Sequence, residues 1–146
     1  MKTREFIAAL GEIEKHGNLD PMVQLFAADA QIWNPELPKP LLGQEGARQF
    51  WREYRATFAS VHSEFRAIIE GQDACALEWL STGTLEANGQ SFEYQGVSVV
   101  AWADDRITRF AAYFDPRALA TGPLRPITAR QAATRAGGSS GASAAS

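Results

Sequence analysis

The sequence contains one cysteine, Cys75, and two histidines, His16 and His62, in 146 residues. A single cysteine excludes an internal disulfide and a metal site built from several thiolates. Neither histidine has a second histidine or a carboxylate at ligand spacing, so we expect no metal site. We predict that Cys75 is a small packing residue and that His62 is exposed.

The sequence also lacks the common nucleotide-binding and nucleophile motifs. It has no GxxxxGK[ST] loop, no GxGxxG, no HExxH and no GxSxG. The net charge is −3 and basic residues form no stripe, which argues against a nucleic-acid partner. No apolar run approaches the length of a membrane span, and the first residues lack a signal-peptide core. We therefore expect a cytoplasmic protein that does not bind membranes.

Four runs rich in β-branched and aromatic residues predict strands over 61–69, 74–85, 91–102 and 107–114. The middle two runs flank Asn88-Gly89, the strongest short-range signal for a β-hairpin. Turn residues also separate the other runs. We predict a four-stranded antiparallel meander.

Three helices and a short strand are expected before the meander. Helical spacing of apolar residues predicts helices over 3–16, from Asp20-Pro21 to about 28, and over 43–58, with a strand over 30–34 between the last two. The third helix carries an aromatic stripe that includes Phe50, Tyr54 and Phe58. These rings either pack as core or line a cavity between the helix and the sheet.

The register of the meander selects one carboxylate. If each hairpin closes on its two central residues, the face of 61–69 that holds Val61 and Phe65 is the inner one. Glu78 then lies in the middle of this apolar face, opposite Phe65 and Val99. A desolvated carboxylate has a raised pKa and suits general acid–base catalysis. The alternatives are an ion pair with an arginine of the third helix, or a one-residue bulge that turns Glu78 outward.

Several local patterns together resemble the nuclear transport factor two-like superfamily, and within it the SnoaL-like polyketide cyclases and limonene epoxide hydrolases. The resemblance covers roughly residues 3–119. Its matching features are Asn34 after the short strand, Glu78-Trp79 followed by Gly83-Thr84, the turn Gly89-Gln90-Ser91, the strand Gly96-Val97-Ser98-Val99, and Ile107-Thr108 leading to Tyr113-Phe114-Asp115.

The resemblance implies an α+β fold, a cone-shaped barrel in which a strongly bent mixed or antiparallel sheet wraps around N-terminal helices with cystatin-like topology. It also implies an apolar pocket used, without any cofactor, for cyclisation, isomerisation or epoxide hydrolysis of hydrophobic or polyketide-like molecules. Ala112 stands where relatives commonly carry an aspartate. The residues around Glu78 do not preserve the arginine–aspartate pair of the epoxide hydrolases.

We predict from these arguments that Glu78 is the general base or acid and that Asn34 and Tyr54 donate hydrogen bonds to an enolate or alkoxide. The residues predicted to bind the substrate are Trp33, Phe50, Phe58, Phe65, Leu80, Val97, Val99, Phe110, Ala112 and Phe114. The alternative function is a non-catalytic module of the same fold that binds a small molecule or dimerises.

Two further expectations concern partners and domain limits. Outer-face aromatics, namely Trp79, Tyr94, Trp102 and Tyr113, predict a homodimer through the outer face of the sheet. The folded domain is expected to span 1–119. Residues 120–146 are rich in glycine, serine and alanine, and we expect a flexible, disordered tail.

Overall fold

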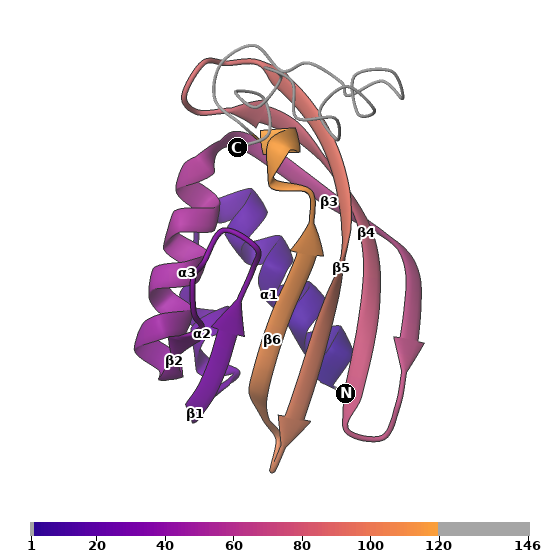
Figure 1. The fold of residues 1–146 in the computed structure, drawn as a ribbon. Helices are drawn as coiled ribbons and strands as arrows, with labels where there is room; N and C mark the ends of the chain where they lie inside the picture. Colours follow the sequence, from indigo (N-terminus) through magenta and orange to yellow (C-terminus); the bar gives the residue numbers. More distant parts are fainter. Residues whose placement is uncertain (1, 120–146) are drawn as a thin grey trace, which may run out of the picture.

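A layer of helices covers the concave face of one strongly bent sheet in the computed structural model, which describes residues 2–119 (Figure 1). The helices are α1 (Lys2–His16), α2 (Asp20–Gln24), α3 (Gly43–Thr57) and the 3-10 helix η1 (Pro116–Leu119). The strands are β1 (Phe26–Trp33), β2 (Leu41–Leu42), β3 (Phe58–Glu70), β4 (Ala74–Leu85), β5 (Ser91–Ala103) and β6 (Arg106–Phe114). The predicted α+β cone is confirmed. The predicted tail, 120–146, lies outside the described residues.

The six strands form one mixed sheet in the order β2-β1-β6-β5-β4-β3. The pairs β3–β4, β4–β5 and β5–β6 are antiparallel, which confirms the predicted meander. The first strand adds to the meander by pairing in parallel with β6. Its other neighbour, β2, was not predicted because two residues after a proline-rich loop show no alternation.

The boundaries of the first three helices follow the sequence closely, except at the end of α2. This helix stops at Gln24 and not near residue 28, because Phe26 is fully buried and pairs with Ile107 as the start of β1. The backbone N–H of Ile107 also donates to the carbonyl of Leu25 at 2.7 Å. Tertiary pairing therefore overrides the local helical pattern.

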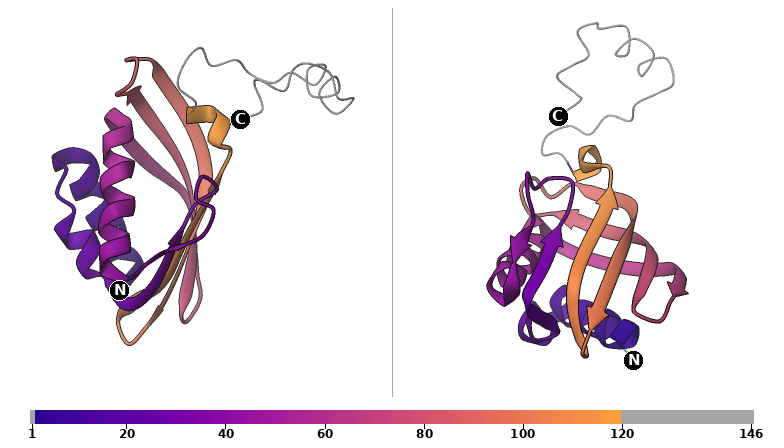
Figure 2. Two further views of the ribbon diagram at one scale, coloured as in Figure 1. Left: turned by 60° about the vertical axis from the view of Figure 1, so that its left-hand side comes forward. Right: turned by 60° about the horizontal axis from the view of Figure 1, so that its bottom comes forward.

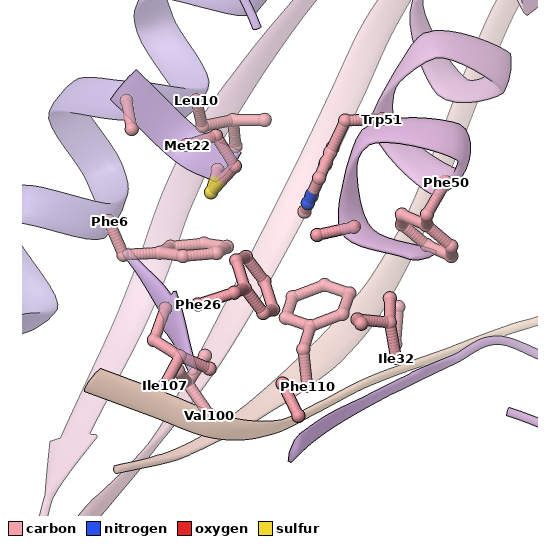
Figure 3. Close-up of a cluster of buried hydrophobic side chains, with 14 of the residues drawn as sticks. Phe6, Leu10, Met22, Phe26, Ile32, Phe50, Trp51, Val100, Ile107 and Phe110 are labelled. Atoms are coloured by element: carbon pink, nitrogen blue, oxygen red, sulfur yellow. The ribbon is translucent and has the colours of Figure 1, made fainter. Parts of the chain in front are cut away.

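The helix α3 lies over the concave face of the sheet (Figure 2, left), and its rings Phe50 and Trp51 point into the core with Phe6 and Phe110 (Figure 3). Phe110 of β6 is central, with its ring centroid 5.5 Å from that of Phe6, 5.6 Å from Phe50 and 5.2 Å from Trp51. All four side chains are at most 7% exposed. Both of the alternatives for this stripe apply, because Phe50 and Trp51 are core residues that also border a cavity.

A bulge in β3 overturns the predicted assignment of faces. Phe65 pairs with Trp79, but the next pair toward the turn joins Ala67 to Glu78, so Arg66 is an extra residue. Partners in an antiparallel pair share a face, and one extra residue in a strand reverses the alternation beyond it. Trp79 therefore shares the concave face with Phe65, while Glu78 lies on the convex face.

A second bulge lies between β5 and β6. Trp102 pairs with Ile107 and Ala101 with Arg109, which leaves Thr108 as the extra residue. The concave face of β6 carries Phe110, as predicted, and the residue paired with it is Val100. As a result of the two bulges, β6 and the first half of β3 present the predicted residues to the concave face, whereas β4 and β5 present the opposite ones.

The hairpin turns differ in how well the sequence predicted them. Asp104 and Asp105 have φ values of 51° and 63° and form the expected two-residue turn. The predicted two-residue turn at Asn88-Gly89 is wrong, since the loop spans 86–89 and Leu85 donates its N–H to Gln90 at 2.9 Å. This shift of two residues leaves the faces of β4 and β5 unchanged relative to each other.

Candidate functional site

A cavity of about 260 Å³ lies between α1, α3 and the concave face of the sheet. It is close to the lower end of the range for small-molecule sites, roughly 300–1,000 Å³. Ten of its 21 lining residues are aromatic. The lining side chains are Phe6, Leu10, Asn34, Glu36, Leu37, Phe50, Trp51, Glu53, Tyr54, Thr57, Phe58, Ser63, Phe65, Trp79, Ser81, Tyr94, Ser98, Phe110, Ala112, Phe114 and Leu119.

Eight of the residues predicted for the site line this cavity. They are Asn34, Phe50, Tyr54, Phe58, Phe65, Phe110, Ala112 and Phe114. They come from β3, β6, α3 and the loop after β1, the elements whose inward faces the sequence indicated correctly.

Glu78 does not face the cavity, and its predicted burial is wrong. The bulge at Arg66 turns it to the convex face, where it is exposed. A one-residue bulge was one of the two alternatives predicted for Glu78, beside an ion pair with an arginine of the third helix, and it is the one that the structure contains. General acid–base catalysis by a desolvated Glu78 therefore has no structural basis.

Leu80, Val97 and Val99 also lie on the convex face and outside the cavity, because β4 and β5 are inverted relative to the prediction. Trp33 lies outside it too: its indole N–H donates to the carbonyl of Leu37 at 3.0 Å, and its ring packs 5.5 Å from that of Tyr113.

The predicted outer-face aromatics are mostly turned inward for the same reason. Trp79 and Tyr94 are each 7% exposed and line the cavity. The indole N–H of Trp79 donates to Ser98 Oγ at 2.9 Å, which holds the ring in the wall. Trp102 is half-buried, and only Tyr113, at 45% exposure, lies on the convex face as predicted.

The polar part of the cavity wall is built around Glu14 of α1, a carboxylate with 9% exposure. Its Oε2 accepts from the hydroxyl of Tyr54 and from the hydroxyl of Ser63, each at 2.6 Å. Its Oε1 accepts from the backbone N–H of Ser63 at 2.9 Å. Ser63 Oγ in turn lies 2.6 Å from Ser81 Oγ. A buried carboxylate with three donors thus stands directly behind the hydroxyls of the wall.

Burial and the negative charge of Glu14 raise the pKa of Tyr54 well above 10.0, its usual value. Burial raises the pKa of Tyr94 in the same direction, with a smaller contribution from the charges of Glu14 and Glu36. Both phenols are therefore neutral at physiological pH. They offer hydroxyl groups to a ligand, not phenolate charge.

Glu14 was not among the predicted site residues, although the sequence contains a signal for it. Leu10, Ile13 and Glu14 follow the i, i+3, i+4 spacing of one helix face, so the carboxylate lies on the apolar stripe of α1. A glutamate in that position is buried only when it has partners. Those partners, Tyr54 and Ser63, are 40 and 49 residues away in the chain, and no local pattern connects them.

Acidic and amide side chains mark the mouth of the cavity. Asn34 is half-buried, and its Oδ1 accepts from the backbone N–H of Glu36 at 2.9 Å. Its amide nitrogen is left as a donor. Glu36 and Glu53 are exposed residues of the same rim. No lysine, arginine or histidine lines the cavity in the part of the chain that the structure describes.

Within residues 2–119, His, Cys, Asp and Glu side chains form no group of three or more that could hold a metal ion. Cys75 is buried beneath α1, and burial raises the pKa of its thiol. No helix among the described residues has both the length and the apolar character needed to cross a bilayer.

Comparison with known proteins agrees with this architecture. A family model described as a SnoaL-like domain matches residues 3–110. An NTF2-like protein from Anabaena variabilis superimposes with a TM-score of 0.71 at 14% identity, over 77% of this chain and 86% of that one. A putative isomerase from Rhodopseudomonas palustris gives 0.67 at 13% identity, over 79% and 90%.

A loop-truncated variant of IdmH gives a TM-score of 0.66 at 25% identity, over 82% of this chain and 96% of that one. A search of curated proteins finds no significant match. The likenesses to the proteins from Anabaena variabilis and Rhodopseudomonas palustris, at 14% and 13% identity, establish the fold alone.

Proposed function

The chain belongs to the SnoaL-like domain family, and we propose that it is a cofactor-independent acid–base enzyme acting on a hydrophobic small molecule in the cavity. The observation that carries the proposal is the 2.6 Å hydrogen bond from Tyr54 to the buried Glu14 at the wall of an aromatic pocket. A carboxylate held behind a hydroxyl is a proton acceptor that reaches the ligand through that hydroxyl.

In the proposed chemistry, Tyr54 Oη takes a proton from an acidic C–H or O–H of the substrate while its own proton moves to Glu14. The substrate is left as an enolate or alkoxide and later recovers a proton by the reverse path. Asn34 at the mouth and the neutral hydroxyl of Tyr94 are the donors for the oxyanion. The role predicted for Tyr54 changes, because its single hydrogen is already donated to Glu14.

Cyclisation, isomerisation and related reactions share an elementary step, the removal of a proton next to a carbonyl. Exchange of the α-hydrogens of 2-tetralone in D₂O, followed by NMR, measures that step alone. We expect the protein to accelerate the exchange. Ala112→Leu, which narrows the cavity, should remove the acceleration, whereas the same change at the exposed Ala103 should not.

Exchange at the buffer rate in the presence of the folded protein would contradict catalysis of this step. It would favour the alternative of a binding module without turnover. A rate that Ala112→Leu leaves unchanged would show that the chemistry takes place outside the cavity.

We also propose a homodimer through the convex face of the sheet, on a set of residues that keeps only Tyr113 of the four aromatics predicted from the sequence. The register aligns Ile69, Ala76 and Val99 across three strands, and the next row holds Val97 and Tyr113 beside the exposed Glu78. Exposures of 68% for Ile69, 37% for Val97 and 45% for Tyr113 give an apolar patch of the kind that marks interfaces. Light scattering should show a dimer that Val97→Lys dissociates, and a monomeric wild type at micromolar concentration would contradict it.

A further inference from the structure

The hydrogen-bond directions in the Glu14 cluster are fixed by which groups carry hydrogens. An ionised carboxylate only accepts, and each hydroxyl has one hydrogen to donate. The hydrogens of Tyr54 and Ser63 therefore both point at Glu14 and away from the cavity. What Tyr54 Oη retains for the cavity is a lone pair.

Ser81 continues the same direction. Since Ser63 gives its only hydrogen to Glu14, Ser81 must be the donor in the 2.6 Å contact between the two serine hydroxyls. The chain from Ser81 through Ser63 to Glu14 is one-directional. Ser81 is 1% exposed, whereas Tyr54 and Ser63 are half-buried, so Tyr54 and Ser63 are the members that meet a ligand.

The rest of the cavity wall carries no positive charge among the described residues that would offset the lone pairs of Tyr54 and Ser63. No cationic side chain lines the cavity among the described residues, and the rim carries Glu36 and Glu53. Trp51 also lines the cavity, but its indole nitrogen is buried and is not open to it. A ligand carboxylate would meet the lone pairs of Tyr54 and Ser63 and the acidic rim, and no cationic side chain of the described lining would offset the loss of its hydration.

We propose that the cavity selects uncharged aromatic molecules that carry a hydroxyl group, such as phenols, hydroxyarenes and the enol forms of aryl ketones, with that hydroxyl donating to Tyr54 Oη. The aromatic walls supply contact area for a flat ring system. The Glu14 cluster supplies the acceptor that distinguishes a hydroxyl from a ketone, an ether or a carboxylate. This ligand class deepens the proposed function and rests on it, because both use the same pair of residues.

The backbone N–H of Ser63 makes the proposal testable with a single substitution. It requires an acceptor at the position of Oε1, so a glutamine at position 14 must place its amide oxygen there. The amide nitrogen then occupies the position of Oε2 and donates to Tyr54 and Ser63. The hydroxyls of Tyr54, Ser63 and Ser81 then reverse the direction in which they donate, and Tyr54 presents its hydrogen to the cavity.

The experiment compares the dissociation constants of 2-naphthol and 2-acetonaphthone, which share a ring system but carry a hydroxyl and a carbonyl respectively. We expect the wild type to prefer 2-naphthol by about tenfold, the value of one hydrogen bond. Glu14→Gln should reduce this ratio to about one or reverse it. Glu64→Gln, the same charge change on the exposed residue next to Ser63, should keep the wild-type ratio.

Equal affinities in the wild type, no binding of 2-naphthol, or a ratio that Glu14→Gln leaves unchanged would each overturn the proposed ligand class. The measurement is independent of turnover. A wild type that shows the expected ratio without catalysing exchange would refute the proposed activity and leave the ligand class in place. A wild type that catalyses the exchange but binds 2-naphthol and 2-acetonaphthone equally would refute the ligand class and leave the proposed activity in place.

Discussion

Replacing Glu14 by glutamine is expected to lower the rate of 2-tetralone exchange by about 10²- to 10⁴-fold, the usual contribution of a positioned general base. Glutamine matches glutamate in size and keeps all three hydrogen bonds, but it cannot take a proton. The variant should therefore fold normally, with a free energy of unfolding close to that of the wild type. NMR of the exchange and urea unfolding of both proteins measure the two effects separately.

Tyr54→Phe should lose a similar factor, since it removes the oxygen that connects the substrate to Glu14. Glu64→Gln should retain the wild-type rate. Glu64 follows Ser63 in β3, and its side chain is exposed on the convex face, away from Glu14. A Glu14→Gln protein that is folded and fully active would remove Glu14 from the mechanism.

The pH dependence separates a relay through neutral Tyr54 from a tyrosinate base. Burial and Glu14 raise the pKa of Tyr54 well above 10.0, so its phenol keeps its proton up to that pH. A relay gives no rise in rate from Tyr54 ionisation as the pH approaches 10.0. A tyrosinate base would instead give a rate that climbs about tenfold per pH unit below its pKa. The exchange rate measured across this range distinguishes them.

The positions of the four meander strands were predictable because turn residues separate the runs of β-branched and aromatic residues. The side that each strand presents was not, because one extra residue reverses everything beyond it. Weak traces of both bulges exist in the sequence. Ile68 and Ile69 are adjacent apolar residues that break the alternation of β3, and the buried Ile107 and Phe110 are an odd number of residues apart in β6.

The candidate site was likewise predictable only in part. The aromatic half of the cavity was predictable, because Phe50, Tyr54 and Phe58 follow a helical stripe and Phe110 lies on the part of the sheet whose face was assigned correctly. The polar half depends on a contact between α1 and β3, and its carboxylate comes from a helix face that looks apolar around it. The acid predicted from the sheet, Glu78, is the neighbour of Trp79, which faces the cavity.

Trp79 and Glu78 therefore form a direct test of the register. Trp79→Ala is expected to destabilise the protein by about 3–5 kcal/mol, as large-to-small changes of buried aromatic residues do. Its ring is 7% exposed, packs 5.0 Å from that of Tyr94 and donates a hydrogen bond to Ser98. Glu78→Ala should change the free energy of unfolding by no more than about 0.5 kcal/mol, because exposed side chains contribute little.

Gly96 gives independent support for the expected difference, since it is the β5 partner of Trp79. A Cβ at Gly96 would lie 2.7 Å from Cζ2 of the indole, so the absence of a side chain there leaves the space that the ring occupies on the concave face. Urea unfolding of the two alanine variants measures both effects with the same method. A larger loss of stability for Glu78→Ala than for Trp79→Ala would mean that the glutamate, and not the tryptophan, faces the helices, and the site built on Glu14 would then have to be abandoned.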